Sequence, residues 1–160
     1  ETHIKNIVLN FLPSVLDYLN INLENTNQIV AGASMGGLMS MKTSILFPQF
    51  RNIISLSPAF WFGYPSVLHD IKNLSNESST YLYTGKKEGH IFGDHVKNIF
   101  PNNWDLDFSN NDDFYYSGVK NIKDSFDSNN KKVIFSFQDN GRHNEISWAT
   151  AIFEILGKLI

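Results

Sequence analysis

The sequence predicts an α/β fold with a parallel sheet and helices on both faces. Two observations lead to this prediction. Short apolar runs bounded by turn residues alternate with longer segments of helical periodicity, and the alternation continues along most of the chain. Strands separated by helices pair in parallel, because each crossover returns the chain to the same end of the sheet. The 160 residues, 42% of them hydrophobic, indicate a single domain over 1–160.

Four brief apolar runs predict the strands. Each is too short for a typical helix and is bounded by polar or turn-forming residues, which favours a buried strand. The predicted strands are 28–32, 52–57, 80–84 and 132–137.

Five segments predict the helices. Pro13 is expected to kink or restart the first of them. Pro48 marks the end of the second, because the residue before a proline avoids the helical conformation, and Pro65 opens the third. The predicted helices are 4–19, 38–47, 65–74, 119–126 and 145–159.

Charge and composition argue against several classes of partner. A formal net charge of -3 gives no basic footprint for nucleic acid or anionic membrane surfaces. No apolar run is long enough to span a membrane. The absence of cysteine excludes disulfides, Cys-ligated zinc and a thiol nucleophile. The compartment stays open, with the cytoplasm slightly favoured, and the oligomeric state is not indicated.

The segment 32–36, Gly-Ala-Ser-Met-Gly, has the pattern of a nucleophile elbow between a buried strand and a helix. This sharp turn is expected to strain the backbone of Ser34 and to present its hydroxyl above the sheet. A Cβ on either flanking glycine is expected to collide with neighbouring backbone. The N–H of Met35, at the helix start, is placed to donate to an oxyanion. The alternative interpretation is an ordinary glycine-rich turn.

A serine needs a base to become nucleophilic, and His143 is the best candidate. It lies in the loop after the last predicted strand, and parallel topology places that loop at the same edge of the sheet as the elbow. The other histidines lie on predicted helices or follow an earlier strand: His3, His69, His90 and His95. The alternative for His143 is a solvated loop residue.

The acid that orients the histidine is expected between Ser34 and His143 in chain order. Glu88 is the preferred candidate because it follows the third strand across a short turn, and Asp94 is the rival. The alternative for Glu88 is a surface charge paired with Lys86 or Lys87.

Two further groups of side chains are candidates for a functional role, and each also has a structural interpretation. His90, Asp94 and His95 are all possible zinc ligands, but their spacing matches no known zinc motif, so no metal site is expected. Trp61 and Phe62 are candidates for the wall of an acyl pocket, with core packing an equal alternative.

Several motifs in this sequence resemble one family of α/β hydrolases, which includes enterochelin esterases, esterase D, feruloyl esterases and mycolyltransferases. The segment 32–38 resembles its G-x-S-M-G-G elbow, and 57–61 its Ser-Pro-x-x-Trp segment. The segment 81–88 resembles the strand and G-x-x-E turn before its acid. The segment 141–145 with Trp148 resembles its G-x-H-x-x-x-x-W ending. The enterochelin-esterase-like branch fits best.

The resemblance implies an α/β-hydrolase fold of which this sequence is the C-terminal portion. Members of the family begin with several strands and a loop that supplies a second oxyanion donor, whereas this sequence opens at the helix before the elbow strand. We therefore expect the N-terminal strands to be missing and the elbow strand to have an unpaired edge. The segment 92–116 also departs from the family, and is interpreted as a solvated insertion in preference to a lid or substrate platform.

The predicted function is hydrolysis of a small-molecule carboxylic ester through an acyl-enzyme, with no cofactor. Ser34 attacks, His143 accepts and returns the proton, Glu88 orients His143, and the Met35 N–H binds the oxyanion. Siderophore esters and acyl-sugar esters are candidate substrates. The alternatives are an acyltransferase of the same fold and a non-catalytic, hydrolase-like binding module.

Overall fold

A computed structural model of the chain describes residues 1–24, 26–99 and 106–159. Its four strands form one parallel sheet in the order β1-β2-β3-β4. The strands are β1 Ile29–Ala33, β2 Asn52–Leu56, β3 Ser79–Gly85 and β4 Lys132–Gln138. The predicted parallel sheet is confirmed, and each strand boundary lies within one residue of the prediction.

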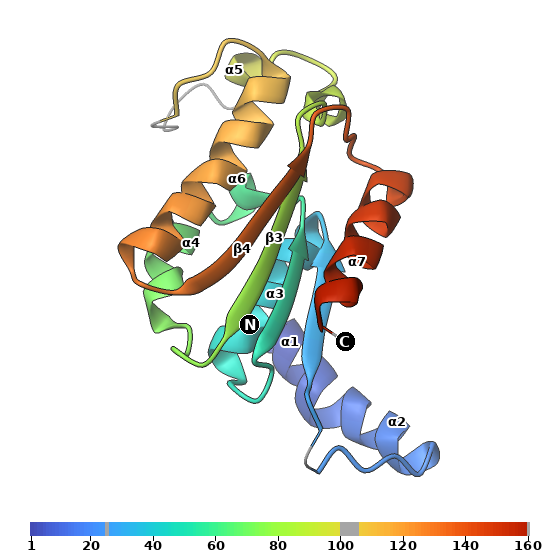
Figure 1. Cartoon of the computed structure of the whole chain (residues 1–160). Helices are drawn as coiled ribbons and strands as arrows, with labels where there is room; N and C mark the ends of the chain where they lie inside the picture. The colour runs from blue at the N-terminus through green and yellow to red at the C-terminus, as the bar shows by residue number, and fades with distance from the viewer. Residues whose placement is uncertain (25, 100–105, 160) are drawn as a thin grey trace.

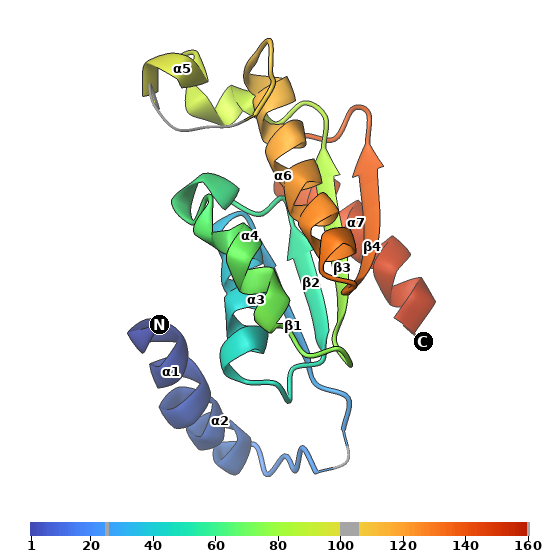
Figure 2. The same ribbon diagram turned by 90° about the vertical axis from the view of Figure 1, so that its left-hand side faces the viewer.

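Helices cover both faces of this sheet, as predicted (Figures 1 and 2). Three helices lie on one face: α3 Met35–Leu46, α4 Ser66–Asp70 and α6 Asn111–Ser128. On the opposite face, α7 Glu145–Leu159 packs across the sheet. The alternation of side chains along β2 explains the two layers, because Ile53 packs with the first group of helices and Ile54 packs with α7.

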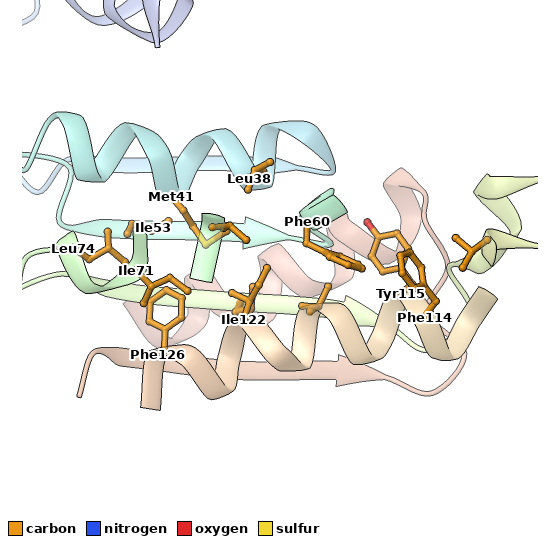
Figure 3. Packing of buried hydrophobic residues seen from close by; sticks show 14 residues of the cluster. Leu38, Met41, Ile53, Phe60, Ile71, Leu74, Phe114, Tyr115, Ile122 and Phe126 are labelled. Carbon is orange, nitrogen blue, oxygen red and sulfur yellow. The ribbon is translucent and has the colours of Figure 1, made fainter. Parts of the chain in front are cut away.

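The larger core lies between the sheet and α3, α4 and α6 (Figure 3). Its side chains come from every one of these elements, and burial of this apolar area supplies the main stabilisation of the fold. At the carboxyl end of the sheet the core becomes aromatic, where Phe60, Phe114 and Tyr115 lie close together (Figure 3). The structured core therefore reaches the edge where the candidate site residues gather.

The N-terminal helical segment restarts at its proline, as predicted. It consists of α1 Thr2–Asn6, a π-helical turn Ile7–Phe11 and α2 Leu12–Tyr18. Pro13 lies in the first turn of α2, directly after the π-helical turn. Only Ile4 and Val8 of this segment are buried, against the loop that contains Phe50.

The interpretation of 92–116 as a solvated insertion is wrong for 111–116, which form the first turns of α6, whereas most of 93–99 and 107–110 is exposed. Helix α6 begins at Asn111, two turns before the predicted start, and its Phe114 and Tyr115 are fully buried. The side chain of Asn110 caps the helix by accepting from the Asp113 N–H, and acidic residues in the first turn complement the helix dipole. Residues 100–105 of this segment lie outside the described part.

Short helical turns complete the chain. They are η2 Phe60–Phe62, η3 Ile71–Asn73, η4 Gly89–Phe92 and α5 Val96–Ile99. The predicted helix 65–74 is therefore α4 followed by η3, with Pro65 at the N-cap. None of the described helices combines the length and the apolar character that crossing a bilayer requires.

Candidate active site

The turn between β1 and α3 holds Ser34 in a strained backbone conformation, as predicted. Its φ of 55° and ψ of -121° lie in a region that non-glycine residues rarely adopt. Hydrogen bonds on both sides fix this conformation: the Ser34 N–H donates to Leu56 O at 2.9 Å, and the Ser34 carbonyl accepts from Ala59 N at 3.0 Å. β2 and the loop that follows it therefore hold the Ser34 backbone in place.

The two glycines beside this turn have different roles. A Cβ on Gly32 would lie 2.4 Å from the carbonyl carbon and oxygen of Gly36, so the strand and helix can cross here only without a side chain. A Cβ on Gly36 would meet nothing within 4 Å. The expected collision is thus confirmed for Gly32 and is wrong for Gly36, because Gly36 already lies in α3 and faces open space.

Met35 is the first residue of α3, which starts three residues before the predicted helix. N–H groups in the first turn of a helix lack partners within the helix and carry the positive end of its dipole. The Met35 N–H is therefore available to a ligand beside Ser34, while the Met35 side chain is 37% exposed. Its oxyanion role stays a prediction.

The Glu88 carboxylate is completely buried at the start of η4. One oxygen, Oε2, lies 2.8 Å from His143 Nδ1. The other, Oε1, accepts from the Ser57 hydroxyl at 2.7 Å and from the Gly85 N–H. Ser57 and Gly85 donate to the carboxylate, and burial of a carboxyl group without such partners would be costly.

Glu88 is not a surface charge, and the rival acid Asp94 has different partners. Lys86 pairs with Asp139 and Lys87 bonds to Asn140, so neither lysine neutralises Glu88. The rival acid, Asp94, is exposed and uses its carboxylate within its own loop. There the His95 backbone N–H and the Asn98 side chain lower the pKa of Asp94, which keeps it ionised.

His143 is not a solvated loop residue, since its side chain is only 10% exposed. Its ring lies against Tyr115, with centroids 5.3 Å apart, and edge-to-face with Trp148, with centroids 4.9 Å apart. The loop reaches this position through a close approach at Gly141, where a Cβ would lie 2.7 Å from Tyr83 Oη. In the neutral tautomer whose Nδ1–H donates to Glu88, Nε2 of the imidazole is the acceptor nitrogen.

The turn between β1 and α3, which contains Ser34, and the loop between β4 and α7, which contains His143, lie at the same carboxyl end of the parallel sheet (Figure 1). Among the described residues no hydrogen bond joins the Ser34 hydroxyl to His143. An apolar hollow of about 340 Å³ lies between β1 and α7, with Ala33 and Trp148 in its wall.

Trp61 and Phe62 differ in their surroundings. Trp61 is partly buried and packs against Phe92 and Tyr115, with ring centroids 5.0 and 5.2 Å apart. Phe62 is 68% exposed. Trp61 is thus one ring removed from His143, and the role of both residues in an acyl pocket stays a prediction.

The other candidate ligands do not form a metal site. His90 and His95 line a surface cleft of about 540 Å³ together with Asp94. The His90 ring faces the Lys87 carbonyl, and the His95 ring stacks on Phe108. In the part of the chain that the structure describes, no three His, Cys, Asp or Glu side chains are grouped to hold an ion.

Three residues around the Glu88–His143 pair were not predicted as site residues: Ser57, Tyr115 and Trp148. Ser57 and Trp148 lie within motifs that the sequence analysis used only for the family resemblance. Tyr115 lies in the stretch interpreted as an insertion. The capping pattern Asn110-x-x-Asp113 before three aromatic residues is the feature from which its helix could have been predicted.

Comparisons with known proteins match the fold of this chain to solved esterase structures. A ferulic acid esterase superposes with a TM-score of 0.67 at 12% identity, over 95% of this chain and 57% of the esterase. The siderophore hydrolase EstB from Aspergillus nidulans superposes with a TM-score of 0.61 at 16% identity, over 95% of this chain and 54% of EstB.

The enterobactin esterase FES from Shigella flexneri, solved in the presence of 2,3-dihydroxy-N-benzoyl-serine, superposes with a TM-score of 0.55 at 19% identity. The match covers 92% of this chain and 35% of FES. This chain therefore spans between about a third and just over half of these structures and shares their fold. No protein-family model matches the sequence, and no curated protein sequence matches it significantly.

Proposed function

We propose that this chain carries the catalytic residues of an esterase that hydrolyses carboxylic esters through an acyl-enzyme on Ser34. The observation that carries the proposal is the buried Glu88–His143 pair, which lies at the same end of the sheet as the strained Ser34 turn. The fold shared with a ferulic acid esterase, an enterobactin esterase and a siderophore hydrolase supports ester chemistry in particular.

In the first half of the reaction, Ser34 Oγ attacks the ester carbonyl carbon. His143 Nε2 takes the serine proton, because its Nδ1–H is held by Glu88, and the buried carboxylate stabilises the imidazolium that forms. The Met35 N–H donates to the oxyanion of the tetrahedral intermediate. His143 then gives its proton to the departing alcohol oxygen, and the acyl group stays on Ser34.

In the second half, water replaces the alcohol. His143 takes a proton from the water as it attacks the acyl carbon, and then returns a proton to Ser34 Oγ as the carboxylic acid leaves. A Ser34–His143 hydrogen bond that is absent without substrate is compatible with this scheme, because such bonds often tighten only in the substrate complex.

We infer that the substrate is a small-molecule ester of a siderophore or an acyl sugar, the latter including feruloyl esters. The names of the matched structures favour siderophore and feruloyl esters, and the partly buried Trp61, which packs on Tyr115 beside His143, offers an aromatic surface to an aromatic acyl group. Turnover of a panel of siderophore, feruloyl, acetyl-sugar and simple p-nitrophenyl esters would rank them.

Replacement of Ser34 by Ala tests the proposed function. We expect Ser34→Ala to abolish ester turnover, by at least about 10³-fold, and to leave the thermal unfolding midpoint nearly unchanged. Ser40→Ala in the same helix, a buried serine bonded to the Gly36 carbonyl, is the matched control and is expected to stay active.

Full activity in the Ser34→Ala variant would refute the assignment. Transfer of the acyl group to an added sugar, seen as a new ester product, would favour the acyltransferase. Binding of esters without any turnover, in the wild-type chain, would favour the non-catalytic module.

A further inference from the structure

Ser57 lies at the centre of a buried hydrogen-bonded chain behind the Glu88–His143 pair. It directly follows β2 and is fully buried. Its hydroxyl oxygen lies 3.0 Å from Trp148 Nε1 and 2.7 Å from Glu88 Oε1. The chain thus runs from α7 through the end of β2 to the carboxylate beside β3.

The direction of each proton in this chain follows from the chemistry of the side chains. An indole N–H can only donate, so the Ser57 oxygen accepts from Trp148. An ionised carboxylate can only accept, so the Ser57 O–H donates to Glu88. Because accepting from the indole polarises the hydroxyl, Trp148 strengthens the bond that Ser57 gives to Glu88.

The backbone of Ser57 is fixed in one orientation. Its φ is 43°, its N–H donates to Tyr83 O at 2.7 Å, and its carbonyl accepts from the Tyr115 hydroxyl at 2.6 Å. These contacts hold the backbone of Ser57 in a sparsely populated conformation. Its hydroxyl is oriented by the bonds to Trp148 and Glu88.

The titratable groups that face Glu88 are His143, Tyr83 and Tyr115. Burial, and then the negative charge of Glu88, raise the pKa of Tyr83 to about 12. The same two causes raise the pKa of Tyr115 well above its usual value. Both phenols therefore stay neutral near physiological pH and add no charge beside Glu88.

We propose that Ser57 and Trp148 are positioning residues of the ester-hydrolysing site, which keep Glu88 ionised and hold its Oε2 against His143 Nδ1. This inference rests on the proposed function for its catalytic consequence, but the bonding itself does not. Loss of the Ser57 hydroxyl removes one of the two donors to Oε1, which makes the buried carboxylate more basic. The Glu88–His143 pair then takes up its first proton at higher pH.

The test uses two variants of the full chain and one matched control. Ser57→Ala removes the hydroxyl, and Trp148→Phe removes the indole donor while keeping a ring beside His143. Ser44→Ala is the control, because Ser44 is equally buried and bonds to a backbone carbonyl, that of Phe50, at the opposite end of the sheet. Thermal unfolding of each variant checks the fold.

The first readout is an NMR titration of the His143 ring, which needs no substrate and no activity. We expect Ser57→Ala to bind the first proton about 3–10-fold more tightly than the wild-type chain and Trp148→Phe to shift in the same direction by less. Ser44→Ala is expected to titrate as the wild type. The double variant is expected to match Ser57→Ala alone, because Trp148 acts through Ser57.

The second readout is the pH profile of kcat/KM for an ester. Its acid limb is expected to move to higher pH in Ser57→Ala, with kcat about 10-fold lower and KM little changed. The inference would be overturned if a folded Ser57→Ala or Trp148→Phe variant bound the first proton with the same affinity as the Ser44→Ala control. Activity that survives in Ser34→Ala would instead refute the proposed function and leave the NMR result standing.

Discussion

The candidate site has two halves that differ in how they are held. The acid–base half, Glu88 and His143, is buried and fixed by hydrogen bonds that converge from β2, β3 and α7. The nucleophile half lies after β1, which in the described residues pairs only with β2, and the preceding residue, Ala33, lines the apolar hollow of about 340 Å³. The expected unpaired edge of the elbow strand is thereby confirmed.

The two halves differ in how many described contacts hold their side chains in place. Every partner of the Glu88 carboxylate is supplied by residues of this chain. The nucleophile half has one strained serine, one candidate oxyanion donor at Met35 and an exposed strand edge. We therefore expect substitutions of Glu88 and His143 to act on chemistry, and substitution of Gly32, beside Ser34, to act first on folding.

The largest expected effect is that of Glu88→Gln. An amide in this buried position cannot stabilise the imidazolium, and its NH₂ group opposes the Nδ1–H tautomer. By analogy with other serine hydrolases we expect kcat to fall by about 10³–10⁴-fold. Ester turnover at saturating substrate is the measurement, with Asp94→Asn as the control that removes the exposed rival carboxylate.

Equal losses in Glu88→Gln and Asp94→Asn, or a loss in Asp94→Asn alone, would contradict the assignment of the acid. They would also contradict the view that the acid–base half is complete within η4, β3 and the His143 loop.

The next largest expected effect is on stability and concerns the nucleophile half of the site. Gly32→Ala places a Cβ 2.4 Å from backbone atoms of Gly36, and we expect it to lower the free energy of unfolding by about 2–4 kcal/mol. Gly36→Ala, at a helical position with open space, is expected to be neutral or to stabilise by up to about 1 kcal/mol. Urea unfolding of both variants measures the difference.

If Gly32→Ala and Gly36→Ala lowered the free energy of unfolding equally, the strand and helix would not cross as closely at Gly32 as described.

The strands were predictable because their apolar runs are short and punctuated by turn residues, which leaves little freedom in their boundaries. Parallel topology then made it possible to predict that Ser34, Glu88 and His143 share one end of the sheet. The choice of Glu88 over Asp94 needed the structure, because both carboxylates follow β3 and lie six residues apart in the sequence. Only the fold of this segment shows that Glu88 bonds to His143 and that Asp94 bonds to its neighbour His95.

Three other features could not be predicted from the spacing of apolar residues or from the motifs. The first two turns of α6 were missed because Asn and Asp dominate there, and the capping by Asn110 outweighs their low helix propensity. The Ser57–Trp148 bond joins residues 91 positions apart, so no local spacing indicates it. Gly36 was misjudged because the elbow motif marks glycines without saying which one faces backbone.

Labelling with a fluorophosphonate probe, followed by peptide mapping, tests the central claim most directly. The probe reacts only with an activated serine, so it reports on Ser34 without requiring the correct ester. We predict a single labelled peptide containing Ser34 in the wild-type chain, and labelling slowed by at least about 10²-fold in His143→Ala. A folded chain in which Ser34 stays unlabelled, or labels equally fast without His143, would contradict the account.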